Sequence, residues 1–138
     1  KKYIVYTNYI RQFIKEFQEI KKFIKINKFG HTLIGNFYYS KGVYYNAVHF
    51  INFIVSIYGM PIKYKVISKK KSETIKSDYL IDFILIYKSF KFYFLSFDTQ
   101  NVSSSNFDII FQRGKIEVSS SRKYKLFKIR KNTLVKNG

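Results

Sequence analysis

Hydrophobic positions recur at two spacings along the chain. Over residues 9–26 they return every three or four residues with Lys and Glu between them, which predicts a helix with one buried face. Residues 47–58 carry few charges and predict a buried helix that ends at Gly59, before Pro61. Short apolar or alternating runs bounded by turn residues are typical of strands. We expect strands over residues 2–6, 32–39, 62–68, 79–87, 90–97, 107–112, 115–119 and 124–130.

The order of these elements predicts an α+β fold. Successive strands joined by short turns pair antiparallel, and two early helices are expected to cover one face of the sheet. Polar residues over 69–78, including Lys69 to Lys71, predict a solvated loop. The strand over 90–97 is apolar on both sides and needs cover on both. We therefore expect a largely antiparallel open sheet whose uncovered, apolar face joins copies of the chain into a homo-oligomer.

Length and composition bound the class of protein. The chain has 138 residues, of which 46% are hydrophobic, enough for one packed domain and too apolar for a disordered segment. It has no cysteine, so disulfides, thiolate nucleophiles and cysteine zinc sites are excluded. Neither a signal peptide nor an apolar run of about 18 residues is present. We expect no membrane partner and a cytoplasmic location. Because the chain opens on Lys1 without Met, we also expect a longer parent protein.

The net charge is +18, which raises the hypothesis of a module that binds nucleic acid or anionic lipid through Lys, Tyr and Phe. Only four of the 26 cations are Arg, the side chain best suited to bidentate phosphate recognition. The sequence is also rich in Lys, Ile, Asn, Tyr and Phe and poor in Gly, Ala and Pro, as in low-GC genomes. We therefore treat nucleic-acid or lipid binding as the alternative and not as the leading reading.

Few residues carry recognisable chemistry. The sequence has no glycine-rich phosphate loop, so we assign no cofactor-binding residues, and no His or carboxylate spacing that indicates a metal site. His31 follows the end of a helix and is expected in a solvated loop. His49 falls in the first turn of the buried helix, where it needs a hydrogen-bond partner. Taken alone, His49 fits an ordinary core histidine.

The residues around His49 change that interpretation. Tyr39-Ser40-Lys41-Gly42, Asn46-Ala47-Val48-His49-Phe50-Ile51-Asn52 and Gly59-Met60-Pro61 follow one another. This series resembles the Gfo/Idh/MocA family of nicotinamide-dependent sugar oxidoreductases, in which a Y-x-K-G turn precedes N-G-x-H-x-I-D and then G-x-P. Residues 7–13, 79–85 and 107–116 are similar to further family motifs in the same order.

The resemblance implies a protein of two domains with different roles. Residues 1–138 would form the C-terminal domain, of the glyceraldehyde-3-phosphate dehydrogenase-like type, and the Rossmann domain that holds NAD or NADP would be absent from this chain. The substrate would be a sugar, cyclitol or nucleotide-linked sugar. His49 would move the hydroxyl proton, and this chain alone would be inactive. The implied substrate-binding residues are Tyr9, Arg11, Lys41, Tyr45 and Asn46.

Three positions depart from the family pattern. Tyr45 stands where the family has an Asp four residues before the histidine, and it is not an anion at neutral pH. Asn52 replaces the Asp three residues after it, and Ala47 replaces a Gly. These changes fit an ordinary sub-branch of the family, a shifted substrate or a domain with weakened catalysis. A non-catalytic scaffold of the same family is a further hypothesis, and all of these stay open at this point.

Overall fold

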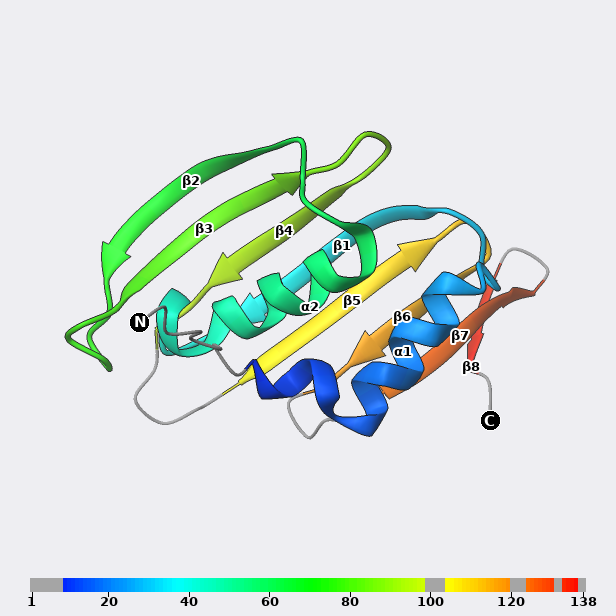
Figure 1. Cartoon of the computed structure of the whole chain (residues 1–138), viewed down its shortest axis with the longest axis horizontal. Helices are drawn as coiled ribbons and strands as arrows, with labels where there is room; N and C mark the ends of the chain where they lie inside the picture. The colour runs from blue at the N-terminus through cyan, green and yellow to red at the C-terminus, as the bar shows by residue number, and fades with distance from the viewer. Residues whose placement is uncertain (1–8, 99–103, 120–123, 131–132, 137–138) are drawn as a thin grey trace, which may run out of the picture.

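A single eight-stranded sheet forms the body of the molecule. The computed structural model describes residues 9–98, 104–119, 124–130 and 133–136. The strands lie in the order β2-β3-β4-β1-β5-β6-β7-β8, and both helices cover one face (Figure 1). The expected α+β class is confirmed. The elements are η1 (Ile10–Phe13), α1 (Lys15–Lys25), β1 (Thr32–Tyr39), η2 (Val43–Ala47), α2 (Val48–Tyr58), β2 (Lys63–Lys71), β3 (Tyr79–Ile86), β4 (Lys91–Ser96), β5 (Ser105–Phe111), β6 (Gly114–Val118), β7 (Tyr124–Arg130) and β8 (Thr133–Lys136).

The first predicted helix is divided in two. Ile14 has an extended backbone, with ψ of 136°, and separates the short 3₁₀ turn η1 from α1. The break turns Phe13 outward, so that it is 63% exposed, whereas Phe17 and Ile20 face the core as expected. Because η1 leaves the axis of α1, it packs against α2 instead. This change of direction brings the start of the described chain toward His49.

The second helix starts earlier than its composition predicts. A π-helical turn, η2, runs directly into α2, so the helical segment begins at Val43 and not at Ala47. Its end agrees with the prediction: Gly59 has φ of 78° and donates its N–H to the Val55 carbonyl.

The strands largely follow the predicted spans, and β1 and β7 match them. The sheet is antiparallel throughout except for the parallel pair β1–β4. The loop predicted for Lys69 to Lys71 is wrong, because these residues pair with β3 and extend β2, although they remain exposed. β8 was not expected. The predicted strand over residues 2–6 lies outside the described residues.

Aromatic side chains fill the space between the helices and the sheet. Phe17 of α1 packs edge-on against Phe53 of α2, with ring centroids 4.8 Å apart. The ring centroids of Phe50 and Phe37 of β1 lie 3.9 Å apart. Phe37 also contacts a ring on β4, and Phe50 contacts a ring on β5. Burying large rings in edge-to-face contact gives stabilisation beyond the area removed from water. This cluster fixes α2 over β1 and so fixes the position of His49.

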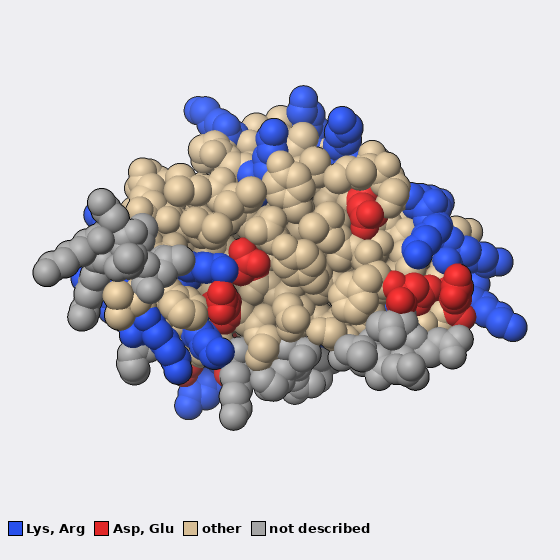
Figure 2. Space-filling view, turned by 180° about the vertical axis from the view of Figure 1, so that it is seen from behind, with Lys and Arg blue, Asp and Glu red and all other residues tan. Residues whose placement is uncertain are grey.

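The other face of the sheet has no helix over it in the described part of the chain, and we call it the open face. Tyr93 and Leu95 of β4 lie on it beside Asn36 and Tyr38 of β1. Figure 2 shows this face from behind: Lys and Arg gather toward its rim, and most of its middle is neither basic nor acidic. Tyr93 and Leu95 give β4 the apolar character that was expected for this side of the strand over 90–97.

Candidate functional site

His49 lies in the first turn of α2, on its partly exposed side. Its Nδ1 atom is buried and has no hydrogen-bond partner among the described residues. Burial lowers the pKa of His49 below its usual 6.5, and the positive charge of Arg11 lowers it further. The imidazole is therefore neutral at physiological pH and able to accept a proton.

Two of the predicted site residues lie near His49: Tyr9, which directly precedes η1, and Arg11 within η1. The Tyr9 ring meets the His49 ring edge-on, with centroids 5.9 Å apart. The Arg11 guanidinium lies over the Phe50 ring, 4.2 Å from its centroid. The structure therefore brings Tyr9, Arg11 and His49 together, although they are separated by about forty residues in the sequence.

The turn before η2 has a constrained backbone. Lys41 has φ of 70° and Gly42 has φ of 102°, both in the region that favours glycine. A Cβ on Gly42 would lie 2.4 Å from Asp78 Oδ2. The turn that joins β1 to the helix therefore needs glycine at position 42 for two independent reasons.

The buried carboxylate of Asp78 explains why the helix starts early. Tyr44 N–H donates to its Oδ1 over 3.1 Å, and Tyr45 N–H donates to its Oδ2 over 2.8 Å. The N–H of Tyr79 also donates to Oδ1. An acceptor anion at the first N–H groups of a helix satisfies donors that have no partner within the helix. Asp78 thus holds the first turn of the segment that carries His49.

Sequence reasoning missed Asp78 as a site residue. It was assigned only to a polar link, because the N–H groups of Tyr44 and Tyr45 that it accepts from lie more than thirty residues away in sequence. The one available signal was the pair Ser77-Asp78 ahead of a strand, which are residue types that cap backbone donors.

The remaining predicted residues lie near the start of the helix but differ in exposure. Tyr45 is 58% exposed, and the ammonium of Lys41 lies 5.6 Å from its ring centroid. Asn46 is only 4% exposed and donates from Nδ2 to the Ser40 carbonyl over 3.1 Å. Lys41 and Tyr45 therefore form an outer pair, and Asn46 lies beneath them in the packed turn.

Three polar side chains follow one another along the helical segment. Asn46, His49 and Asn52 are spaced three residues apart, so they lie along one side of it. Asn46 Oδ1, His49 Nδ1 and Asn52 Oδ1 are each buried and without a hydrogen-bond partner among the described residues. Such atoms are rare in folded proteins because each costs free energy. We call these three residues the polar row.

The described residues give no basis for assigning a dinucleotide or metal site. The sequence has no glycine-rich phosphate loop, and within the described ranges no group of three His, Cys, Asp or Glu could hold a metal ion. Likewise, none of the helices in these ranges is long and apolar enough to cross a membrane.

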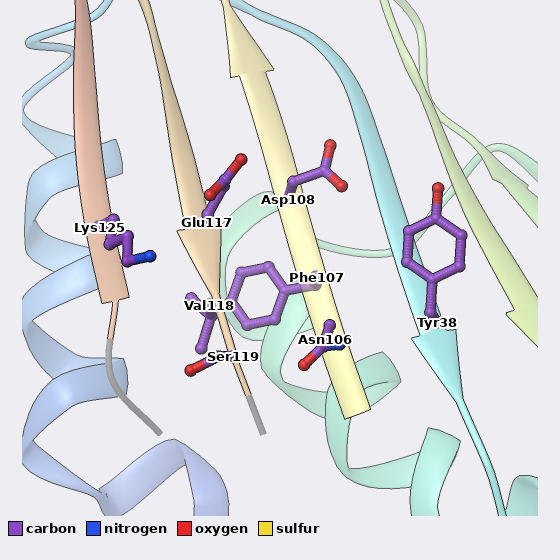
Figure 3. Close-up of a pocket in the computed structure, with 8 residues that line it drawn as sticks. All are labelled: Tyr38, Asn106, Phe107, Asp108, Glu117, Val118, Ser119 and Lys125. Atoms are coloured by element: carbon purple, nitrogen blue, oxygen red, sulfur yellow. The ribbon is translucent and has the colours of Figure 1, made fainter. Parts of the chain in front are cut away.

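A hollow of about 320 Å³ lies on the opposite side of the sheet from His49, on the open face (Figure 3). Asp108, Glu117 and Lys125 line it from three neighbouring strands, with Tyr38 beside them on β1. Asn36 Nδ2 donates to Asp108 over 3.2 Å, and Lys115 forms an ion pair of 2.8 Å with Glu117. Charged, polar and apolar side chains line this hollow, which belongs to the open face and not to the surroundings of His49.

Comparison with known proteins places the fold. No protein-family model matches the sequence, and no curated protein matches it. Among solved structures, a protein from Desulfitobacterium hafniense that is described as an NADPH-dependent oxidoreductase is similar to this chain, with a TM-score of 0.74 and 10% sequence identity. The match covers 96% of this chain and 49% of the Desulfitobacterium chain. An oxidoreductase from Agrobacterium radiobacter, in complex with NAD+, L-tartaric acid and magnesium, has a TM-score of 0.65 at 13% identity, over 91% and 43%.

A dehydrogenase from Clostridium difficile is similar in the same way, with a TM-score of 0.64 at 10% identity, over 94% of this chain and 44% of its own. The chain thus spans less than half of each of these three oxidoreductases. At these identities the likeness concerns the fold. The chain has the fold of the C-terminal domain of Gfo/Idh/MocA-type oxidoreductases.

Proposed function

We propose that this chain is the substrate-binding domain of an NAD(P)-dependent oxidoreductase that acts on a sugar, a cyclitol or a nucleotide-linked sugar. The polar row carries the proposal: Asn46, His49 and Asn52 each hold a buried polar atom that no described residue satisfies. A ligand with several hydroxyl groups supplies partners for atoms of this kind. Core packing alone gives no reason to retain three of them along one helix.

His49 is the proton-transfer residue in this proposal. A neutral imidazole accepts the proton of the substrate hydroxyl, and the lowered pKa of His49 keeps it neutral near pH 7. Tyr9 meets the ring edge-on and restricts its orientation. In this proposal the nicotinamide, which takes up a hydride when bound, would be held by a domain outside this chain, because this sequence has no glycine-rich phosphate loop.

The similar structures support the cofactor part of the proposal. One is described as NADPH-dependent, and another was solved with NAD+ and L-tartaric acid, a hydroxy acid. Tyr45 and Asn52 stand where the family resemblance implies carboxylates, so the proton accepted by His49 would not be shared with an aspartate at either position.

A second copy of this chain is the partner that we propose for the open face. Ile84 and Tyr93 lie opposite each other on it, next to Leu95 and Tyr38, and all are at least partly exposed. A sheet face of this composition gains free energy when it is covered. The fold leaves this face free of helices in the described residues, opposite to the side that carries His49 (Figure 1).

The test of the catalytic role is the His49→Asn variant in the complete protein. We expect NAD(P)-dependent turnover to fall about a hundredfold or more, because general acid–base groups contribute rate factors of that size. His31→Asn is the matched control, since His31 is exposed and lies at the other end of β1. Retained turnover in His49→Asn would contradict the role of His49 and favour a non-catalytic scaffold.

A further inference from the structure

The charge around His49 is positive. The two positions where the family resemblance implies aspartate are Tyr45 and Asn52, so the carboxylates nearest to the histidine in the pattern are missing. In their place Arg11 is held over Phe50, the residue directly after His49. Lys41 lies over Tyr45, one helical turn before the histidine.

Three of the acidic side chains in the described residues, Asp78, Asp82 and Glu117, have partners away from the polar row. Asp78 is the acidic residue nearest to the start of the helix, and both of its oxygens accept backbone N–H groups in a buried setting. Asp82 accepts from two serines, and Glu117 pairs with Lys115, both on the open face. These three carboxylates are therefore occupied by partners other than the polar row.

Packing against Phe50 holds the Arg11 side chain in place. Its guanidinium lies 4.2 Å from the Phe50 ring centroid, and its Nη1 atom is out of solvent. Phe50 is itself fixed by Phe37 and Phe107. A guanidinium held in one place beside a partly buried polar site is suited to a planar or tetrahedral anion, because its donors are fixed in a fork.

We infer that the substrate carries a negatively charged oxygen group, a carboxylate or a phosphate, that Arg11 binds while the polar row binds its hydroxyl groups. This inference rests on the proposed function and narrows it to anionic members of the substrate class. An anion beside Arg11 also offsets the charge that opposes protonation of His49. Lys41, at the outer edge, adds to the attraction without contacting the reacting group.

The test follows the two histidine side chains by NMR in the whole chain while D-gluconate, D-glucose 6-phosphate or neutral D-glucose is added. We expect a saturable shift of the His49 signals with one or both anionic sugars and a much weaker effect of D-glucose. His31 is exposed, distant and present in the same sample, so it reports general ion binding to this highly charged protein. Gluconate and the phosphate ester distinguish the two kinds of anion.

Variants of Arg11 make the result specific. Arg11→Gln should weaken anion binding about tenfold or more, and Arg11→Lys should retain part of it. Lys91→Gln, on an exposed position of β4, removes one charge elsewhere and should leave the binding unchanged. Thermal unfolding of each variant reports whether the fold is kept.

Three results would overturn the inference. They are equal shifts with D-glucose, parallel shifts of His31 and His49, and binding that survives Arg11→Gln. Equal shifts with D-glucose leave the proposed function standing with a neutral sugar. Loss of the proposed function is recognised separately, by full turnover of His49→Asn in the complete protein.

Discussion

At the scale of single residues, the surroundings of His49 determine its protonation. Burial and the Arg11 charge disfavour the imidazolium in the folded chain. The unfolded chain has no such restraint, and its histidine titrates near 6.5. As the pH falls below that value the unfolded state takes up the proton first, so stability is lost, and the loss levels off below the folded pKa.

The corresponding prediction compares the wild type with His49→Gln. The free energy of unfolding of the wild type, relative to the variant, should decrease as the pH is lowered from about 7.5 to about 5. Urea unfolding at several pH values measures it, and an NMR titration of His49 should give a midpoint below 6.5. A difference that stays constant, or that grows toward acid pH, would show that His49 is not held neutral by the fold.

Some site residues could be predicted from the sequence, and others could not. His49, Tyr9 and Arg11 were named because they fall in motifs of a recognisable order, and the structure places all three together. Asp78 was missed because its role depends on a contact between separate segments. The motif order also gave no sign that Asn46 would be buried while Tyr45 would be exposed.

At the scale of elements, the turn from β1 into η2 controls where the site begins. Gly42 has a positive φ and faces the Asp78 carboxylate, whereas Gly59 has a positive φ and open space around it. A comparison of alanine variants at the two glycines therefore separates the cost of a positive φ from the cost of a clash with Asp78.

We predict that Gly42→Ala costs about 2–4 kcal/mol of unfolding free energy, since it adds a clash to the strain of a positive φ. Gly59→Ala, the matched control, carries the strain alone and should cost about 1–2 kcal/mol. Denaturant unfolding of both variants is the measurement. Equal losses would mean that the contact between Asp78 and the turn does not hold the helix start.

The elements also show where periodicity is a reliable guide. Short apolar runs bounded by turn residues predicted β1 and β7 over their observed spans, because local pattern and sheet pairing agree there. The helix over residues 9–26 was predicted as continuous, since its apolar spacing is unbroken. Its division at Ile14 depends on η1 packing against α2, a tertiary contact that no local pattern contains.

At the scale of the whole molecule, the two faces of the sheet have different environments. The helices cover one face with an aromatic core, and the open face has Tyr93 and Leu95 near its middle with cations at the rim (Figure 2). The charges on this face oppose association of copies, and the exposed apolar side chains around Tyr93 and Leu95 favour it.

We predict that the chain forms a dimer or larger oligomer and that Leu95→Lys shifts it to monomer, because a lysine in the middle of the face would be buried without a partner. Ile62→Lys, an exposed site outside the open face, is the control. Light scattering during size-exclusion chromatography over a range of concentrations measures the state. A wild-type monomer at all concentrations, or an unchanged oligomer in Leu95→Lys, would remove the open face as the interface.

We propose that this chain is one part of a nicotinamide-dependent oxidoreductase, and reading the coding sequence upstream of Lys1 tests this proposal most directly. The account predicts an in-frame segment of similar length that encodes a strand, a G-x-G-x-x-G turn and a helix, the phosphate-binding part of a Rossmann domain. A start codon immediately before Lys1, with no such segment, would contradict it and make salt-dependent binding to nucleic acid or anionic lipid the function to measure instead.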